Sequence, residues 1–192
     1  MRFDVLGIGN AIVDVLARVD EEFLVRHDLV KGAMRLIDEA QAHDLYEALG
    51  PTVESSGGSA ANTIAGAASF GLRTAFIGKV RNDQLGEVFA HDIRATGAHF
   101  ATPAATRGPS TARCLVLITP DGERTMNTWL GASQNLGPED IDEAQVKAAA
   151  ITYLEGYLWD PPKAKDAFVK AAGIARAAQR KVALTLSDAF CV

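Results

Sequence analysis

The segment Ser56-Gly57-Gly58-Ser59-Ala60-Ala61-Asn62 is the strongest local signal in the sequence. Two consecutive glycines precede an alanine-rich run, Ala60 to Phe70, that has helical spacing and is closed by Gly71. Such glycines let backbone N–H groups approach a ligand, and small residues at 59 to 61 leave room above the helix N-terminus. Asn62 would lie in the first helical turn, where its amide can both donate to and accept from a hydroxyl. A tight turn of small residues without a ligand is the alternative.

A second polar pair follows the first predicted strand, Phe3 to Gly9. The sequence Gly7-Ile8-Gly9-Asn10-Ala11-Ile12 is similar to a dinucleotide-binding turn, but Ile12 stands where the third glycine belongs and the next segment continues as a strand. Asn10 and Asp14 remain at the end of the first strand, where open α/β sheets bind ligands. One carboxylate can accept from two vicinal hydroxyls, so the pair suits a sugar. A solvated Asp14 without a ligand is the alternative.

The rest of the chain alternates apolar runs with segments of helical period, which predicts a doubly wound, mostly parallel α/β sheet with helices on both faces. Further strands are predicted at 74–78, 151–155 and 182–186, and further helices at 20–29, 38–50, 83–96, 139–149 and 161–178. Strands near 13–19, 33–37 and 112–129 are too polar on alternate positions for the centre of a parallel sheet. They are expected to form a small antiparallel layer, either a lid over a cleft or an extension of the sheet.

Composition narrows the class of protein. The 192 residues include 19 basic and 24 acidic side chains, a net charge of −5, and are 48% hydrophobic, which is ordinary for a globular protein with a sizeable core. The acidic excess argues against nucleic acid as a partner, and no stretch approaches the roughly 18 apolar residues of a membrane span. Asp4 lies where a signal peptide would have an uncharged apolar stretch, so a cytoplasmic location is expected. Cys114 and Cys191 are interpreted as buried free thiols, and the four histidines show no metal-binding spacing.

Several motifs together carry a resemblance that runs the whole length. Gly-x-Gly-Asn-x-x-x-Asp at 7–14 precedes Gly-Gly-Ser-Ala-Ala-Asn at 57–62, and Gly-Glu-Arg-Thr follows at 122–125. Phe76 to Val80 with Asp83 and Gly86 fits a Gly-x-Val-Gly-x-Asp-x-x-Gly stretch, and 153–157 and 184–187 also match. This set resembles the PfkB family of carbohydrate kinases, although Ile64 stands where the pattern prefers a small residue. The resemblance implies a ribokinase-like α/β fold with a small antiparallel β lid.

Within that family, Gly9-Asn10 with Asp14, Asn62 to Ile64 and Leu184 to Ser187 look more like adenosine kinases than sugar kinases. The resemblance implies ATP-dependent phosphorylation of a sugar 5′-hydroxyl, with adenosine as the expected substrate. The residues that it assigns to the ribose hydroxyls are Asn10, Asp14, Gly57, Gly58 and Asn62. It also places Arg124 near the transferred phosphate and Tyr157 against the base. A core aromatic at 157 is an equal alternative.

Two motifs of the family are not found in these 192 residues. One is Asn-x-x-Glu, which helps organise Mg²⁺ and phosphates, and the other is Gly-x-Gly-Asp, which supplies an anion hole and the general base. Asn127 and Asn135 lack a glutamate three residues on, and Asp188 lacks the glycines. Residues 1–192 are therefore expected to be the N-terminal, substrate-binding part of one domain, with the base and most of the ATP and Mg²⁺ site beyond residue 192.

Three alternatives stay open at this point. The first is a sugar kinase acting on a ribose-like or fructose-like substrate. The second is a non-catalytic module that binds a nucleoside or sugar. The third concerns assembly, because the sequence does not separate a monomer from a homodimer formed through the lid.

Overall fold

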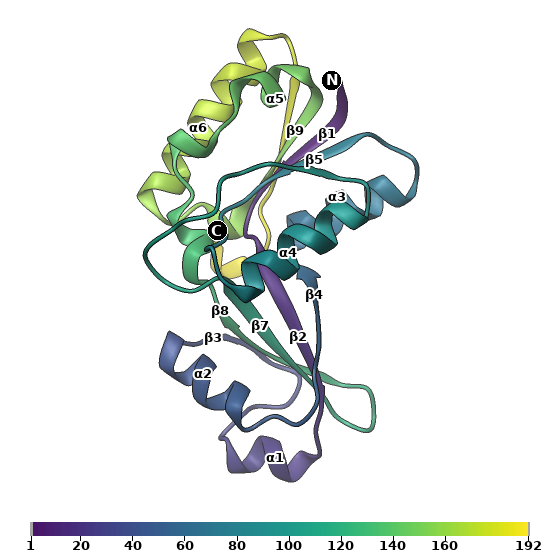
Figure 1. Ribbon diagram of the computed structural model, residues 1–192, viewed down its shortest axis with the longest axis vertical. Helices are drawn as coiled ribbons and strands as arrows, with labels where there is room; N and C mark the ends of the chain where they lie inside the picture. Colours follow the sequence, from purple (N-terminus) through teal and green to yellow (C-terminus); the bar gives the residue numbers. More distant parts are fainter. Residues whose placement is uncertain (1, 192) are drawn as a thin grey trace.

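The computed structural model describes residues 2–191, and within this range the strands form two five-stranded sheets (Figure 1). The first sheet is wholly parallel, with the order β10-β9-β1-β5-β6. Its strands are β1 (Phe3–Ile8), β5 (Thr74–Ile77), β6 (His99–Phe100), β9 (Ala149–Glu155) and β10 (Lys181–Thr185). The second sheet has the order β3-β8-β7-β2-β4. Its strands are β2 (Ile12–Arg18), β3 (Met34–Leu36), β4 (Val53–Gly57), β7 (Ala112–Ile118) and β8 (Arg124–Trp129).

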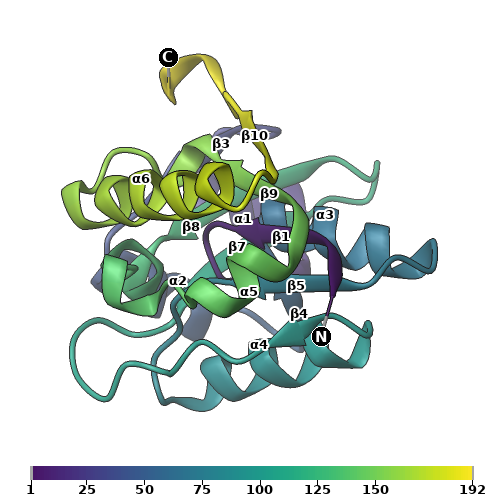
Figure 2. The same cartoon turned by 90° about the horizontal axis from the view of Figure 1, so that it is seen from above.

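Helices cover both faces of the parallel sheet, as predicted, so that β1 lies between α4 and α6 (Figure 2). Leu6 and Ile8 of β1 are fully buried toward α5 (Glu143–Ala148) and α6 (Pro162–Ala177). The opposite face packs against α3 (Ser59–Ser69) and α4 (Gln84–Ala95). Gly7 permits this packing, because a Cβ at that position would lie 2.6 Å from Ile64 Cγ1 of α3.

The second sheet has one covered and one open face. Val13, Val15 and Ala17 of β2 are buried beneath α1 (Glu21–Arg26), α2 (Glu39–Glu47) and α4. The alternate residues of β2, such as Ile12 and Asp14, face the other way because successive strand side chains point to opposite faces. This sheet therefore presents an open face beside the end of the parallel sheet.

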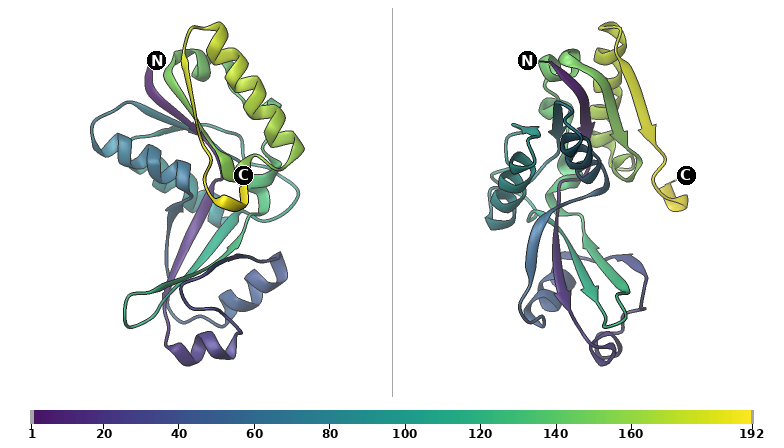
Figure 3. Two further views of the ribbon diagram at one scale, coloured as in Figure 1. Left: turned by 180° about the vertical axis from the view of Figure 1, so that it is seen from behind. Right: turned by 90° about the vertical axis from the view of Figure 1, so that its right-hand side faces the viewer.

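The layer predicted to be antiparallel is in fact a mixed sheet. Strand β2 pairs antiparallel with β4, and β7 pairs antiparallel with β8, but β2 with β7 and β3 with β8 run parallel. The reason is that β2, which follows β1, and β7, which follows the loop after β6, begin side by side and run outward together, with Ile12 opposite Ala112 (Figure 3). The polarity pattern of a single strand does not show whether that strand runs parallel or antiparallel to its neighbours.

Three local predictions differ from the structure. The helix predicted at 139–149 divides into the 3₁₀ turn η2 (Pro138–Asp140) and α5, because Asp142 caps a new start by accepting from Ala144 N at 2.8 Å. Strand β4 was not predicted, since its serines have low strand propensity and it forms by pairing with β2. Cys114 is buried, but Cys191 in the 3₁₀ turn η4 (Ala189–Cys191) is only half-buried.

The remaining turns lie near the ends of the strands. They are the 3₁₀ segments η1 (Gly131–Asn135) and η3 (Gly156–Leu158), which follow β8 and β9. None of the helices in residues 2–191 is long and apolar enough to cross a membrane.

Candidate functional site

A cavity of about 250 Å³ lies where the carboxyl ends of β1 and β9 meet the open face of the mixed sheet. Its polar lining residues are Asn10, Thr128, Gln134, Tyr157 and Asp160. Its apolar lining residues are Ile12, Met34, Leu36, Met126, Leu130 and Pro161. The cavity therefore has the composition of a small-molecule site, with a large apolar wall and a few polar groups that can fix orientation.

Asn10 lies two residues after the end of β1 and is held by three hydrogen bonds to two residues. Its backbone N and its Nδ2 donate to Glu155 Oε2 at 2.6 and 2.9 Å, and its Oδ1 accepts from Ser133 Oγ at 2.7 Å. The residue is only 1% exposed, yet it lines the cavity. Among residues 2–191, Nδ2 donates to Glu155 alone, so one hydrogen of the amide has no protein acceptor there.

Glu155, the last residue of β9, joins this site to helix α3. Its Oε1 accepts from Ala60 N at 2.9 Å and from Ser59 Oγ. Helix α3 begins after Gly58, which has no side chain to cap it, so the glutamate satisfies a first-turn N–H from another strand. Gly9 makes room for this carboxylate, because a Cβ there would lie 2.7 Å from Glu155 Oε2.

Gly57 and Gly58 are both required by close neighbours. A Cβ at position 57 would lie 2.4 Å from Asp14 Cγ, and one at position 58 would lie 2.5 Å from the backbone oxygen of Asn10. Gly58 also has φ +95°, a conformation that other residues rarely adopt. The two glycines therefore bring the start of α3 against both polar residues that follow β1.

Asp14 lies on the open face of β2, opposite Ser55 and Cys114. Burial raises the pKa of its carboxyl from 3.8 to about 6, and the positive charge of Arg124 acts in the opposite direction. No hydrogen bond to the Asp14 side chain is present among residues 2–191, which leaves its oxygens available to a ligand. Burial also raises the pKa of the neighbouring Cys114 thiol to about 11, which disfavours its thiolate form.

The residues predicted from the sequence are only partly brought together. Asn10 and Tyr157 line the same cavity, and Gly57 touches Asp14. Burial raises the pKa of Tyr157 above its ordinary value, and its backbone N donates to Ser187 Oγ at 3.1 Å. Asn62 is exposed on the first turn of α3, and Arg124 is exposed on β8. The residues predicted for the site that are not among those lining the cavity are Asp14, Gly57, Gly58, Asn62 and Arg124, so their proposed contacts with a ligand stay predictions.

Several residues of the site were not predicted. They are Glu155 and Ser133 in the hydrogen-bonded network, and Met34, Leu36 and Met126 on the apolar wall. A signal for Glu155 existed, since it is a single carboxylate at the end of an apolar strand that neighbours the first one. Met34 and Leu36 gave no such signal, because a strand of three residues is too short to show which of its faces is buried.

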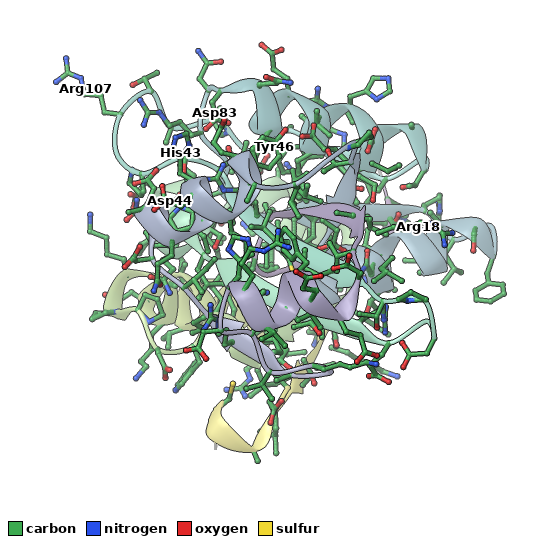
Figure 4. The ribbon with its side chains drawn as sticks, turned by 90° about the horizontal axis from the view of Figure 1, so that it is seen from below. Arg18, His43, Asp44, Tyr46, Asp83 and Arg107 are labelled. Carbon is green, nitrogen blue, oxygen red and sulfur yellow. The ribbon has the colours of Figure 1, made fainter. Side chains whose placement is uncertain are left out.

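The stretch around Asp83 has a structural explanation away from the cavity. Its side chain caps α4 by accepting from Gly86 N at 2.9 Å and also accepts from Thr111 N at 2.9 Å. A Cβ at Gly86 would lie 2.0 Å from the backbone oxygen of Arg81, so no larger residue fits. In Figure 4, Asp83 lies on the same side as Arg107, which projects outward from the loop after β6. This stretch fastens α4 to the start of β7.

The described residues 2–191 contain no group of three or more His, Cys, Asp or Glu side chains that could hold a metal ion. No residue in this range is therefore assigned to a metal ion.

Comparison with known proteins identifies relatives over nearly the whole chain. The family described as pfkB family carbohydrate kinase matches residues 34–191. A guanosine-inosine kinase of Escherichia coli (strain K12) is 28% identical over 206 residues, which cover 98% of this chain and 46% of that protein. A 5-dehydro-2-deoxygluconokinase of Shouchella clausii is 26% identical and is covered to 51% of its length. The chain thus spans about half the length of the curated relatives that it matches.

Two solved structures are more similar. An adenosine kinase from Sinorhizobium meliloti is 57% identical with a TM-score of 0.90, and the match covers 100% of this chain and 59% of that one. A probable sugar kinase protein from Rhizobium etli CFN 42 is 52% identical with a TM-score of 0.91, covering 100% and 58%. These likenesses confirm the predicted ribokinase-like α/β fold.

Proposed function

Since this chain belongs to the pfkB family of carbohydrate kinases, we propose that it holds the acceptor substrate of an ATP-dependent kinase acting on the 5′-hydroxyl of a nucleoside, with adenosine as that substrate. The observation that carries the proposal is the division of the cavity into a buried polar end at Asn10 and an apolar wall that includes Met34 and Met126. A nucleoside has the same division, into a ribose and a flat base.

The apolar wall favours a nucleoside over a bare sugar. Hydroxyls placed against Met34, Leu36 and Met126 would lose water without gaining hydrogen bonds, which is costly. A purine would instead contact the methionine sulfur atoms and side chains favourably. The 57% identity to the adenosine kinase from Sinorhizobium meliloti supports the same choice.

The proposed positions for the ribose are supplied by Asn10, which lines the cavity, and by the neighbouring Asp14, Gly57 and Gly58. In this proposal the Asp14 carboxylate accepts from two ribose hydroxyls, the Asn10 amide donates to the sugar, and Gly57 and Gly58 let the sugar approach the start of α3. Asn62 adds a contact from the first turn of the helix. Because phosphoryl transfer depends chiefly on positioning and charge neutralisation, holding the hydroxyl in line is the main contribution expected of this chain.

Two further roles belong to the same proposal. Tyr157 stacks on the base, since an aromatic ring on the cavity wall can contribute about 1–3 kcal/mol by stacking. Arg124 neutralises phosphate charge when the mixed sheet closes over the cavity as a lid, because a guanidinium pairs well with phosphate oxygens. No described residue is assigned as the general base.

Calorimetric titration of the chain with adenosine, guanosine, inosine, ribose and fructose tests the proposal. We expect adenosine to bind at least about tenfold more tightly than ribose, since the base adds apolar contact. Equal binding of ribose or fructose would instead favour a sugar kinase, as the name of the Rhizobium etli protein suggests for that relative. A coupled assay of ATP consumption with each ligand then separates a kinase from a binding module.

A further inference from the structure

The proposed function gives Asn10 a contact with the substrate, and on that basis we propose that Glu155 is its positioning residue. The glutamate itself does not touch the substrate. It holds the Asn10 amide and the first turn of α3 in one arrangement, so that both parts of the sugar-binding edge keep a fixed separation before the ligand arrives.

The acceptor sites of Glu155 are all used within the protein. An ionised carboxylate offers about four lone-pair sites. Two donors reach Oε2, namely N and Nδ2 of Asn10 at 2.6 and 2.9 Å. Two others reach Oε1, namely Ala60 N at 2.9 Å and Ser59 Oγ. The side chain is also 1% exposed and is not part of the cavity wall. It has neither a free acceptor site nor access to a ligand.

Three parts of the chain meet at this one carboxylate. It belongs to β9, and its partners belong to the connection between β1 and β2 and to the start of α3, 145 and 95 residues away in sequence. The same connection and the same helix carry the groups assigned to the ribose. Displacing the glutamate would therefore change the position of Asn10 relative to the start of α3.

The orientation of the Asn10 amide also depends on Glu155. Nδ2 donates to Glu155, and Oδ1 accepts from Ser133 Oγ at 2.7 Å. If the amide were flipped, its oxygen would lie against the carboxylate oxygen of Glu155, where two acceptors repel each other. Glu155→Gln breaks this arrangement without a change of shape. If the glutamine NH₂ group replaces Oε2, it lies against the two N–H groups of Asn10, and donor then faces donor. If it replaces Oε1, it lies against the backbone N–H of Ala60. No rotamer restores four hydrogen bonds.

The test is a double-mutant cycle of Glu155→Gln and Asn10→Ala, with adenosine affinity measured by calorimetry. We expect Glu155→Gln to weaken binding about tenfold or more, as expected for loss of charge-assisted hydrogen bonds. In the Asn10→Ala background the same change should have a smaller effect, because only the part that acts through the start of α3 remains. Phe168→Leu, in α6 on the other face of the sheet, is the control: it lowers stability but should leave adenosine affinity unchanged.

A second readout does not require a ligand. The side-chain amide resonances of Asn10 should shift in Glu155→Gln and stay in place in Phe168→Leu. Wild-type affinity in folded Glu155→Gln, or losses that add fully in the cycle, would overturn the proposal. If the wild-type chain binds no nucleoside, the proposed function fails, and unshifted Asn10 resonances alone would then overturn the positioning role.

A milder variant serves if Glu155→Gln does not fold. Ser59→Ala removes one donor to Oε1 and leaves the carboxylate and Asn10 in place. We expect adenosine affinity to fall roughly threefold, in line with the loss of a single hydrogen bond. No change in either the affinity or the Asn10 resonances would count against the proposal.

Discussion

Gly57 lies directly against the carboxylate of Asp14, so that a Cβ on the glycine would be 2.4 Å from Asp14 Cγ. The two residues also lie on paired strands, with Asp14 opposite Ser55 on β4. The absence of a side chain at Gly57 therefore leaves the space that the Asp14 carboxylate occupies.

Gly57→Ala should displace the Asp14 carboxylate and weaken adenosine binding by about tenfold or more, because a hydrogen bond to a charged group is worth about 1.5–3 kcal/mol. Calorimetry with the folded variant measures the effect. Gly66→Ala, in the middle of α3, is the matched control, since nothing lies within 4 Å of a Cβ there. It should leave affinity unchanged and raise stability by about 0.5–1 kcal/mol. Equal affinities for the two variants would show that Asp14 does not need its present position.

Nucleoside binding should depend on pH through Asp14. Its pKa is raised to about 6, mainly by burial, and the proposed sugar contacts require the ionised form as acceptor. Adenosine affinity should therefore fall as the pH drops below about 6, measured by calorimetry between pH 5 and 8. Arg124→Gln removes the charge that lowers this pKa, so the fall should begin at a higher pH. An affinity that is flat across this range would contradict the role of Asp14.

The same carboxyl should affect stability in the opposite direction. In the folded chain Asp14 keeps its proton to about pH 6, whereas its ordinary pKa is 3.8. Between these values the folded state binds more protons than the unfolded state, so the contribution of Asp14 to stability falls as pH rises. Asp14→Asn should remove this part of the pH dependence in urea unfolding without ligand. If the two proteins show parallel curves from pH 4 to 7, burial of Asp14 has no such cost.

Met126→Ala should separate recognition of the base from recognition of the sugar. The methionine belongs to the apolar wall, and burial of such a side chain is worth about 1.5–3 kcal/mol. We expect adenosine to bind about tenfold more weakly and ribose to bind as before. Val25→Ala on α1, where the side chain is 79% exposed, is the control. A similar loss for ribose and adenosine would mean that the wall does not contact a base.

Gly86→Ala should destabilise the fold without a direct effect on the cavity. A Cβ at this position would lie 2.0 Å from the backbone oxygen of Arg81, and overpacking of this kind costs about 1–3 kcal/mol or more. Gly173→Ala in α6, where nothing lies within 4 Å, should instead stabilise by up to about 1 kcal/mol. Urea unfolding followed by circular dichroism compares the two. A stable Gly86→Ala would show that the capped start of α4 can move.

Local chemistry made part of the fold predictable from the sequence. Asp20, Asp38 and Asp83 were expected at or beside helix starts, and each side chain accepts from a first-turn N–H at the start of its helix. The apolar runs of β1 and β9 were also recognisable, because a buried parallel strand needs them. Both signals depend on residues within one turn or one strand.

Contacts between distant segments could not be predicted in this way. Strand β4 contains Val53 to Gly57, and its pairing with β2 rather than its composition makes it a strand. Asn10 was expected in the site, but its partners Glu155 and Ser133 lie 145 and 123 residues away. The sequence shows a polar residue after β1, Asn10, and another at the end of β9, Glu155. That β1 and β9 are neighbours is known only from the order of strands in the sheet.

The connection between the two sheets also bears on how the cavity could change size. Asn10 lies in the short link between β1 of the parallel sheet and β2 of the mixed sheet, and Glu155 and Ser133 hold it in place. A rotation of the mixed sheet would therefore turn about an anchored pivot beside the proposed sugar position. In the proposed function Met126, which lies at the level of Leu16 and so farther from this pivot than Asp14, would move more against the base than Asp14 moves against the ribose, so one hinge would admit bases of different size.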